Sequence, residues 1–136
     1  PAKAFYDPGF NSIDGFIVKR DKNDYVLIIK DNRMKLYKKL ASDVRTKEGS
    51  AAAYYVLEDV FAGGDMDKAE KAIFAYSERE PQAYWLAKAF ILLGDVYVKK
   101  GDNFQARATW QSVADGYSPA DDGIVAEAKE RIAKLN

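Results

Sequence analysis

The sequence predicts a mainly α-helical protein: antiparallel helix pairs stacked as a solenoid, a C-terminal capping helix and an N-terminal β-hairpin. Three observations support this fold class. Helical apolar spacing dominates from about residue 49 onward, a helix-pair pattern occurs twice at a fixed offset, and two short β-rich apolar runs precede the helices. With 136 residues, 48% of them hydrophobic, the chain is long enough for one domain with a substantial core.

The N-terminal part begins with the hairpin signal. The apolar runs Phe16–Val18 and Tyr25–Ile29 lie on either side of the polar stretch Lys19–Asp24, which is typical of two strands joined by a turn. The strands are expected at Phe16–Lys19 and Tyr25–Lys30. In this interpretation the first helix begins near Asn32. The chain then divides into a β-hairpin segment, residues 1–32, and a helical domain, residues 33–136.

A second interpretation of this part stays open. Residues 24–44 could form one more helix of the solenoid, with a buried stripe of Val26, Ile29, Leu36, Leu40 and Val44. The hairpin is favoured, because Tyr25–Ile29 is a solid β-rich run and Asp31-Asn32 would interrupt the helix. An isolated hairpin is marginal in water and has unpaired edges, so we expect a homodimer through residues 16–30.

The first helix pair lies in AAAYYVLEDVFAGGDMDKAEKAIFAYSEREP, residues 51–81. Gly64 predicts the end of its first helix, and Asp65 predicts the N-cap of its second. Ala69 is the small residue of the second helix, and Pro81 closes the pair.

The second helix pair shows the same pattern more fully. Its first helix is expected at roughly 82–100, Gly101 ends it, and Asp102 caps the next helix. Ala106 follows Ala69 at an offset of 37 residues. The positions that define the pattern are Phe90, Leu93, Gly94, Tyr97, Ala106, Trp110 and Pro119. In the first pair, Leu57, Val60 and Ile73 replace Gly94, Tyr97 and Trp110.

Small residues in the second pair predict a close helix crossing. Gly94 on the first helix and Ala106 on the second are expected to face each other. A last helix is predicted from Ile124 to Leu135, where Ile124, Ala128, Ile132 and Leu135 keep one apolar stripe. This helix suits the open end of a solenoid, which needs a cap with a polar outer face.

Residues 34–136 resemble the tetratricopeptide repeat family. The phrases DVRTKEGSAAAYY, YWLAKAFILLGDVYVKKGDNFQA and DGIVAEAKERIAKL are similar, more narrowly, to the C-terminal end of long repeat proteins of bacterial envelopes. The resemblance implies a helical superhelix that binds other proteins, no enzymatic activity, and a place in the periplasm or cell envelope.

The resemblance also implies a binding surface on the concave face, which the first helix of each pair lines. Mapped onto this sequence, the partner-binding residues are Tyr54, Glu58, Phe61, Lys88, Ile91, Asp95 and Lys99. A peptide or helix would find apolar anchors there, with charges of both signs beside them. Alternatively, some of these residues pack on a neighbouring repeat of a longer protein, and the chain is its terminal structural cap.

A second resemblance covers only residues 5–31. FYDPGFNSIDGFIVKRDKNDYVLIIKD looks like one blade of the five-bladed propeller glycoside hydrolases that act on arabinan and xylan. Asp14 matches the residue that tunes the catalytic acid in that family. The motifs of the other two acids and the other blades are absent from this sequence, so the resemblance implies an inactive fusion fragment at most.

The composition excludes several kinds of site. The chain contains no Cys and no His, which excludes disulfides, Cys/His zinc sites and Ser-His or Cys-His nucleophile pairs. Lys+Arg and Asp+Glu both number 21, so the net charge is zero and no nucleic-acid partner is expected. No run approaches the ~18–20 apolar residues of a membrane span, so direct membrane insertion is not expected either.

Two pairs of acidic residues are expected to stabilise helix ends and not to form a metal or catalytic site. Asp65 with Asp67, and Asp121 with Asp122, stand at expected helix N-termini, where carboxylates are stabilised by capping and the helix dipole. No catalytic, cofactor or metal site is therefore predicted.

Overall fold

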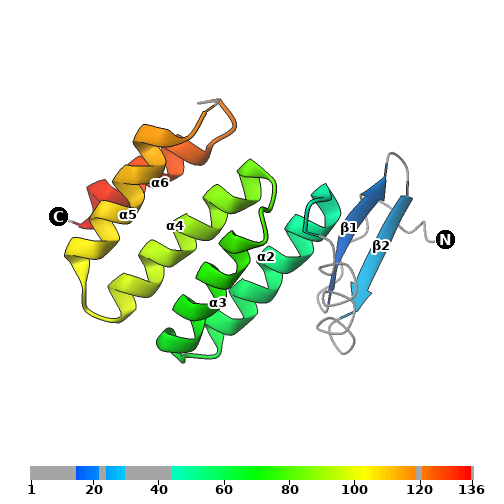
Figure 1. Ribbon diagram of the computed structural model, residues 1–136, viewed down its shortest axis with the longest axis horizontal. Helices are drawn as coiled ribbons and strands as arrows, with labels where there is room; N and C mark the ends of the chain where they lie inside the picture. Colours follow the sequence, from blue (N-terminus) through cyan, green and yellow to red (C-terminus); the bar gives the residue numbers. More distant parts are fainter. Residues whose placement is uncertain (1–14, 22–23, 30–43, 119–120, 136) are drawn as a thin grey trace.

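The computed structural model describes residues 15–21, 24–29, 44–118 and 121–135. In this part of the chain two strands precede five helices, which follow one another along the long axis of the molecule (Figure 1). The elements are β1 (Gly15–Asp21), β2 (Asp24–Ile29), α2 (Lys47–Ala62), α3 (Met66–Glu78), α4 (Ala83–Lys99), α5 (Asn103–Gly116) and α6 (Ile124–Leu135). None of the described helices is both long and apolar enough to cross a membrane.

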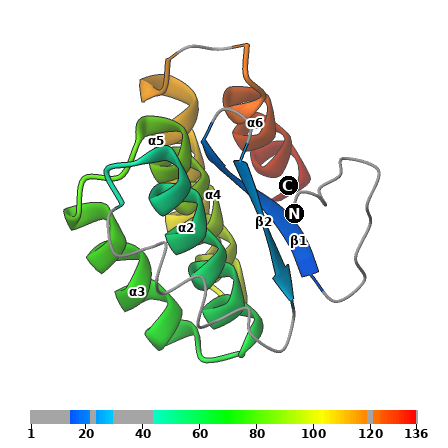
Figure 2. The same ribbon diagram turned by 90° about the vertical axis from the view of Figure 1, so that its right-hand side faces the viewer.

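The backbone of β1 and β2 forms a two-stranded antiparallel sheet, in which Phe16 pairs with Ile28 and Val18 with Val26. These strands lie where the sequence predicts the hairpin. The extended backbone of β2 does not fit the alternative of a continuous helix over residues 24–44. β1 contacts α2, and Figure 2 views the molecule from this end, with both strands in front.

Some expectations fall on residues that the structure does not describe. Asp14, the expected helix start near Asn32, the boundary between residues 32 and 33, and Pro119 all lie outside the described residues.

Each helix pair turns at the residues that the sequence singled out. Gly64 and Gly101 have φ angles of +94° and +82°, a conformation that glycine adopts without strain. The Asp65 side chain accepts a hydrogen bond from Lys68 N at 3.1 Å, and Asp102 accepts one from Gln105 N at 3.0 Å. Both predicted N-caps are therefore confirmed, and the short connections make the paired helices antiparallel.

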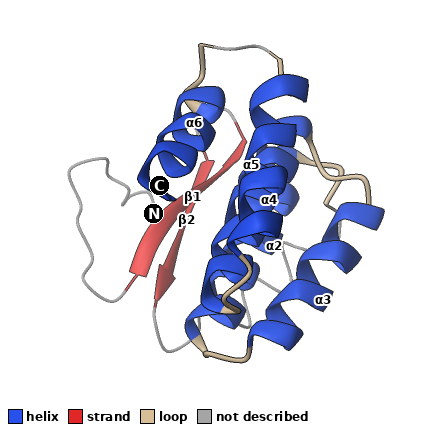
Figure 3. Cartoon of the chain, turned by 90° about the vertical axis from the view of Figure 1, so that its left-hand side faces the viewer, coloured by secondary structure: helices blue, strands red, loops and turns tan. Residues whose placement is uncertain are grey.

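The helices pack on their neighbours in sequence: α2 on α3, α3 on α4, α4 on α5, and α5 on α6. α4 also contacts α2 and α6, so these three helices form one layer and α3 and α5 form the other. Figure 3 shows the same row from the α6 end. A helical domain with sequential helix packing is thus confirmed, and α6 has the predicted bounds.

The close crossing in the second pair brings the Trp110 side chain against Gly94. A Cβ built on Gly94 would lie 2.1 Å from Trp110 Nε1, and its three nearest atoms all belong to that indole. Trp110 is 3% exposed, and its Nε1 donates a hydrogen bond to Ile91 O at 3.0 Å. Gly94 therefore makes room for the indole, while Ala106, which was expected to face Gly94, is fully buried in the core.

A buried serine ties the start of α2 to the connection between the two pairs. The Ser50 hydroxyl donates to Val44 O and accepts a hydrogen bond from Gln82 N at 2.9 Å. Tyr76 Oη donates to Ser50 O at 2.8 Å. Ser50 is fully buried, so all of these polar atoms are satisfied inside the protein.

Candidate functional site

The predicted partner-binding residues lie on two neighbouring helices of one layer. Tyr54, Glu58 and Phe61 are three or four residues apart on α2, and such residues share one face of a helix. The other four residues are similarly spaced on α4, which contacts α2. They are Lys88, Ile91, Asp95 and Lys99.

Two of these side chains belong to the packing between the helices. Tyr54 is 5% exposed and Ile91 is 2% exposed. The Tyr54 hydroxyl donates to Glu58 Oε2 at 2.8 Å. Burial, followed by the charge of Glu58, raises the pKa of Tyr54 well above its usual range, so the phenol remains neutral. Neither side chain offers open surface to a partner in this arrangement.

Two others are held by α6 through ion pairs. Lys88 Nζ lies 3.6 Å from Glu127 Oε1 and 5.9 Å from the centre of the Tyr54 ring. Arg131 donates two hydrogen bonds to the Asp95 carboxylate, at 2.9 and 3.1 Å. It also donates to Glu127 Oε2 at 2.6 Å. The sequence did not point to Glu127 or Arg131, because their role depends on where α6 packs.

Three of the predicted residues lie at one cavity, here called the front cavity, which is lined by residues of α2, α4, α5 and α6. It has a volume of about 360 Å³. Phe61, Asp95 and Lys99 line it, as do further residues that the sequence did not single out: Val98, Trp110, Arg131, Lys134 and Leu135. Glu58 is half-buried on α2 and does not line it.

The front cavity combines an apolar lining with a positive rim. Lys99, Arg131 and Lys134 contribute cations, while Asp95 contributes the single lining carboxylate and is bound to Arg131. Lys99 is exposed, and the Lys134 side chain is 75% exposed with Glu130 at 3.5 Å. The two lysines can therefore reach an anionic group of a ligand.

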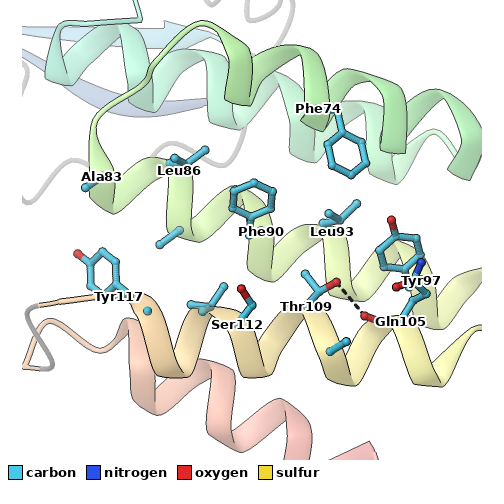
Figure 4. A pocket seen from close by; sticks show the side chains of 14 residues that line it. Phe74, Ala83, Leu86, Phe90, Leu93, Tyr97, Gln105, Thr109, Ser112 and Tyr117 are labelled. Carbon is cyan, nitrogen blue, oxygen red and sulfur yellow. Dashed lines mark hydrogen bonds between the residues drawn. The ribbon is translucent and has the colours of Figure 1, made fainter.

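A larger hollow lies on a different face of α4, between α3 and α5, and is here called the back groove. It has a volume of about 690 Å³ (Figure 4). Its lining is mostly apolar, with Leu86, Phe90 and Leu93 from α4 and Phe74 from α3. Phe74 is 43% exposed. The back groove shares no lining residue with the front cavity.

Sequence reasoning missed the back groove, although α4 carries a signal for it. The helix sequence AYWLAKAFILLGDVYVK is apolar around most of its circumference, which is typical of a helix covered on several sides. The pattern does not indicate which side remains open, because that depends on the separation of α3 and α5.

Three of the four paired aspartates have structural contacts in the fold, and Asp65 has the predicted capping role. Asp65 caps α3, and Asp67 lies 2.8 Å from Lys100 Nζ. Asp122 accepts hydrogen bonds from Ile124 N at 3.1 Å and from the Tyr117 hydroxyl. Across the described ranges, no group of three or more Asp and Glu side chains is arranged to hold a metal ion.

Comparison with family models, curated proteins and solved structures gives no match for this chain.

Proposed function

We propose that the chain is a non-enzymatic protein-interaction module of tetratricopeptide type, which binds a peptide or helix of another protein at the front cavity. The observation that carries the proposal is the convergence of Phe61, Asp95 and Lys99, from two helices, on one cavity. The helix pairs that repeat at an offset of 37 residues, with glycine turns and aspartate caps at matching places, support the tetratricopeptide assignment.

The chemistry of the front cavity indicates the class of peptide. Phe61, Val98 and Leu135 provide apolar contacts, and the exposed lysines 99 and 134 provide positive charge. An apolar side chain flanked by Asp or Glu matches both features, because complementary rim charges select a partner and speed its association.

The test is selection from a library of displayed peptides, followed by binding measurements on the selected sequences. We expect the selected peptides to share an apolar residue beside acidic residues. Lys99→Glu should weaken their binding by about tenfold or more at low salt. Lys129→Glu is the matched control, because Lys129 is exposed on α6 and does not line the cavity. Equal weakening by both variants would exclude the front cavity as the binding site.

A second candidate function is the terminal structural cap of a longer repeat protein. The outer face of α6 supports it: Lys129, Glu130 and Lys134 are exposed there, as suits the polar end of a solenoid. A cap without a ligand of its own should select no peptide family from the library. The two functions therefore predict opposite outcomes of the same experiment.

The proposal includes the absence of hydrolase activity. We expect the pure chain to release no sugar from arabinan or xylan, with Asp14→Ala as the comparison variant. Sugar release by the parent that this substitution abolishes would favour the carbohydrate-active fragment instead.

A further inference from the structure

The back groove carries an inference independent of the front cavity. It runs along α4, with α3 on one side and α5 on the other, and its open side faces away from α4 (Figure 4). Leu86 and Phe90 are only half-buried at its floor, and Phe74 is 43% exposed at its edge. Apolar surface gathered in one hollow is typical of a site that another molecule covers.

The floor of the groove has the spacing of a helix-packing seam. Five lining residues of α4 are separated by three, four, three and four positions: Ala83, Leu86, Phe90, Leu93 and Tyr97. Apolar residues at these intervals form the stripe along which one helix receives the side chains of another. Among the described elements, α3 and α5 flank this stripe: Leu86 and Phe90 remain half-buried, whereas Leu93 and Tyr97 are buried.

The lining chemistry limits what can enter. Within the described ranges, none of the residues that line the groove carries a charge. The polar ones include Thr109, whose hydroxyl already donates to Gln105 O at 2.8 Å. Ala87, Ala108 and Gly116 leave space close to the backbone. A ligand must therefore insert uncharged, apolar groups, because an unpaired charge placed there would be desolvated without compensation.

The shape of the groove and the charged residues at its edge indicate which kind of partner fits it. An apolar groove along a helix suits a protruding helix whose apolar face enters it. On α3, Lys71 and Glu78 are exposed, three residues before and four after Phe74. They share a helix face with it and lie one heptad apart. Such an edge complements a helix that carries an acidic and a basic residue at the same separation.

We propose that the back groove binds an amphipathic helix of another protein, with apolar residues at alternating three- and four-residue spacing and opposite charges one heptad apart beside them. The Lys100–Asp67 ion pair places the N-terminal end of α3 beside the C-terminal end of α4. Lys71 therefore lies toward Tyr97, and Glu78 toward Ala83. The acidic residue of the bound helix lies near Lys71, and its basic residue lies near Glu78.

The experiment uses fluorescein-labelled synthetic helices of about three heptads, with Leu, Ile, Met or Phe at the seam positions. The flanking Glu and Lys stand one heptad apart, and fluorescence anisotropy measures binding to the full chain. We expect saturable binding by at least one peptide. A peptide of the same composition with the apolar residues moved off the seam should not bind.

Two variants locate the bound peptide. Ala108→Glu places a carboxylate in the groove at an exposed position, so the fold is retained, and it should weaken binding at least tenfold. Phe104→Glu is the matched control on the same helix: Phe104 is 82% exposed and does not line the groove, so binding should persist. Circular dichroism checks that both variants remain folded.

Three outcomes would overturn the proposal. The first is no saturable binding by any of the peptides up to about 100 μM. The second is binding that Ala108→Glu leaves unchanged. The third is a parent chain that self-associates in light scattering and becomes monomeric on Ala108→Glu, which would assign the groove to a second copy.

Discussion

At the scale of the residue, Gly94 and Trp110 form a contact in which the large indole packs against a residue without a side chain. The indole occupies the volume where any other side chain at residue 94 would begin. In the first helix pair, Leu57 and Ile73 hold the corresponding positions and are 5% and 1% exposed. The two pairs therefore fill the same crossing in different ways: one with an indole over glycine, the other with two aliphatic side chains of similar size.

Because of this contact, adding a single methyl group at residue 94 should lower the stability of the protein substantially. Gly94→Ala should cost about 1–3 kcal/mol in the free energy of unfolding, because the Trp110 ring must move within a packed core. Urea denaturation measures the change. Gly116→Ala is the control, since a Cβ there meets nothing within 4 Å. The double variant Gly94→Leu/Trp110→Ile copies the first pair and should lose less stability than the two single variants together.

Ser50 gives a second prediction at this scale. Ser50→Ala removes the hydroxyl that joins Val44 O to Gln82 N, and it leaves polar backbone groups without that partner. The expected loss is about 1–3 kcal/mol in the free energy of unfolding. Ser77→Ala provides the comparison, because its hydrogen bond to Phe74 O is exposed and should matter by less than about 0.5 kcal/mol. Similar losses for both variants would contradict the role of Ser50.

At the scale of the element, Lys100 links the end of α4 to the start of α3. Its Nζ lies 2.8 Å from both Asp67 Oδ1 and Glu70 Oε1. The hydrogen bond from Lys100 lowers the pKa of each carboxyl group, and for Glu70 the Tyr97 hydroxyl lowers it further. The same carboxylates raise the pKa of Lys100.

These shifts predict how the link depends on pH. A carboxyl group whose pKa is lowered by folding stabilises the fold when the pH is above its unfolded-state pKa, which is near 4. This stabilisation is lost as the pH falls through the folded-state pKa. The raised pKa of Lys100 contributes stability that is lost as the pH rises, and this loss occurs only at strongly alkaline pH. Lys100→Gln should therefore lower the melting temperature at pH 7 but match the parent once the pH falls below the lowered pKa values of Asp67 and Glu70. Lys129→Gln, an exposed control, should show no such convergence.

The elements also show why sequence reasoning succeeded in some places and failed in others. The caps at Asp65 and Asp102 depend on chemistry within four residues, so they could be predicted. The spacing places Trp110 close to the crossing at Gly94, but it does not reveal where the ring points, so the direct contact of the indole with the glycine could not be predicted. The ion pair between Asp95 and Arg131 spans 36 residues and depends on how α6 packs. Ile91, which the resemblance placed on a binding surface, is 2% exposed.

At the scale of the whole molecule, the hairpin bears on self-association. In the described residues the sheet has two strands, and each pairs only with the other, which leaves outer edges for a further strand. We predict a dimer through residues 16–30, measured by light scattering at micromolar concentration. Ile28→Lys should shift the mass toward the monomer, because it adds a charge to β2. A monomeric parent would contradict the prediction.

The packing of each helix on its neighbours in sequence also has a kinetic consequence. The turns between helices are short, and even the Arg131–Asp95 pair, which joins α6 to α4, closes a loop of only 36 residues. Little chain entropy must be lost before such contacts form, so the helical part has a low contact order. Stopped-flow or temperature-jump measurements should find folding of the helices in microseconds to milliseconds. Native-state hydrogen exchange should find opening at α6 before α4, because among the described elements α6 ends the row of helices, whereas α4 packs between its neighbours.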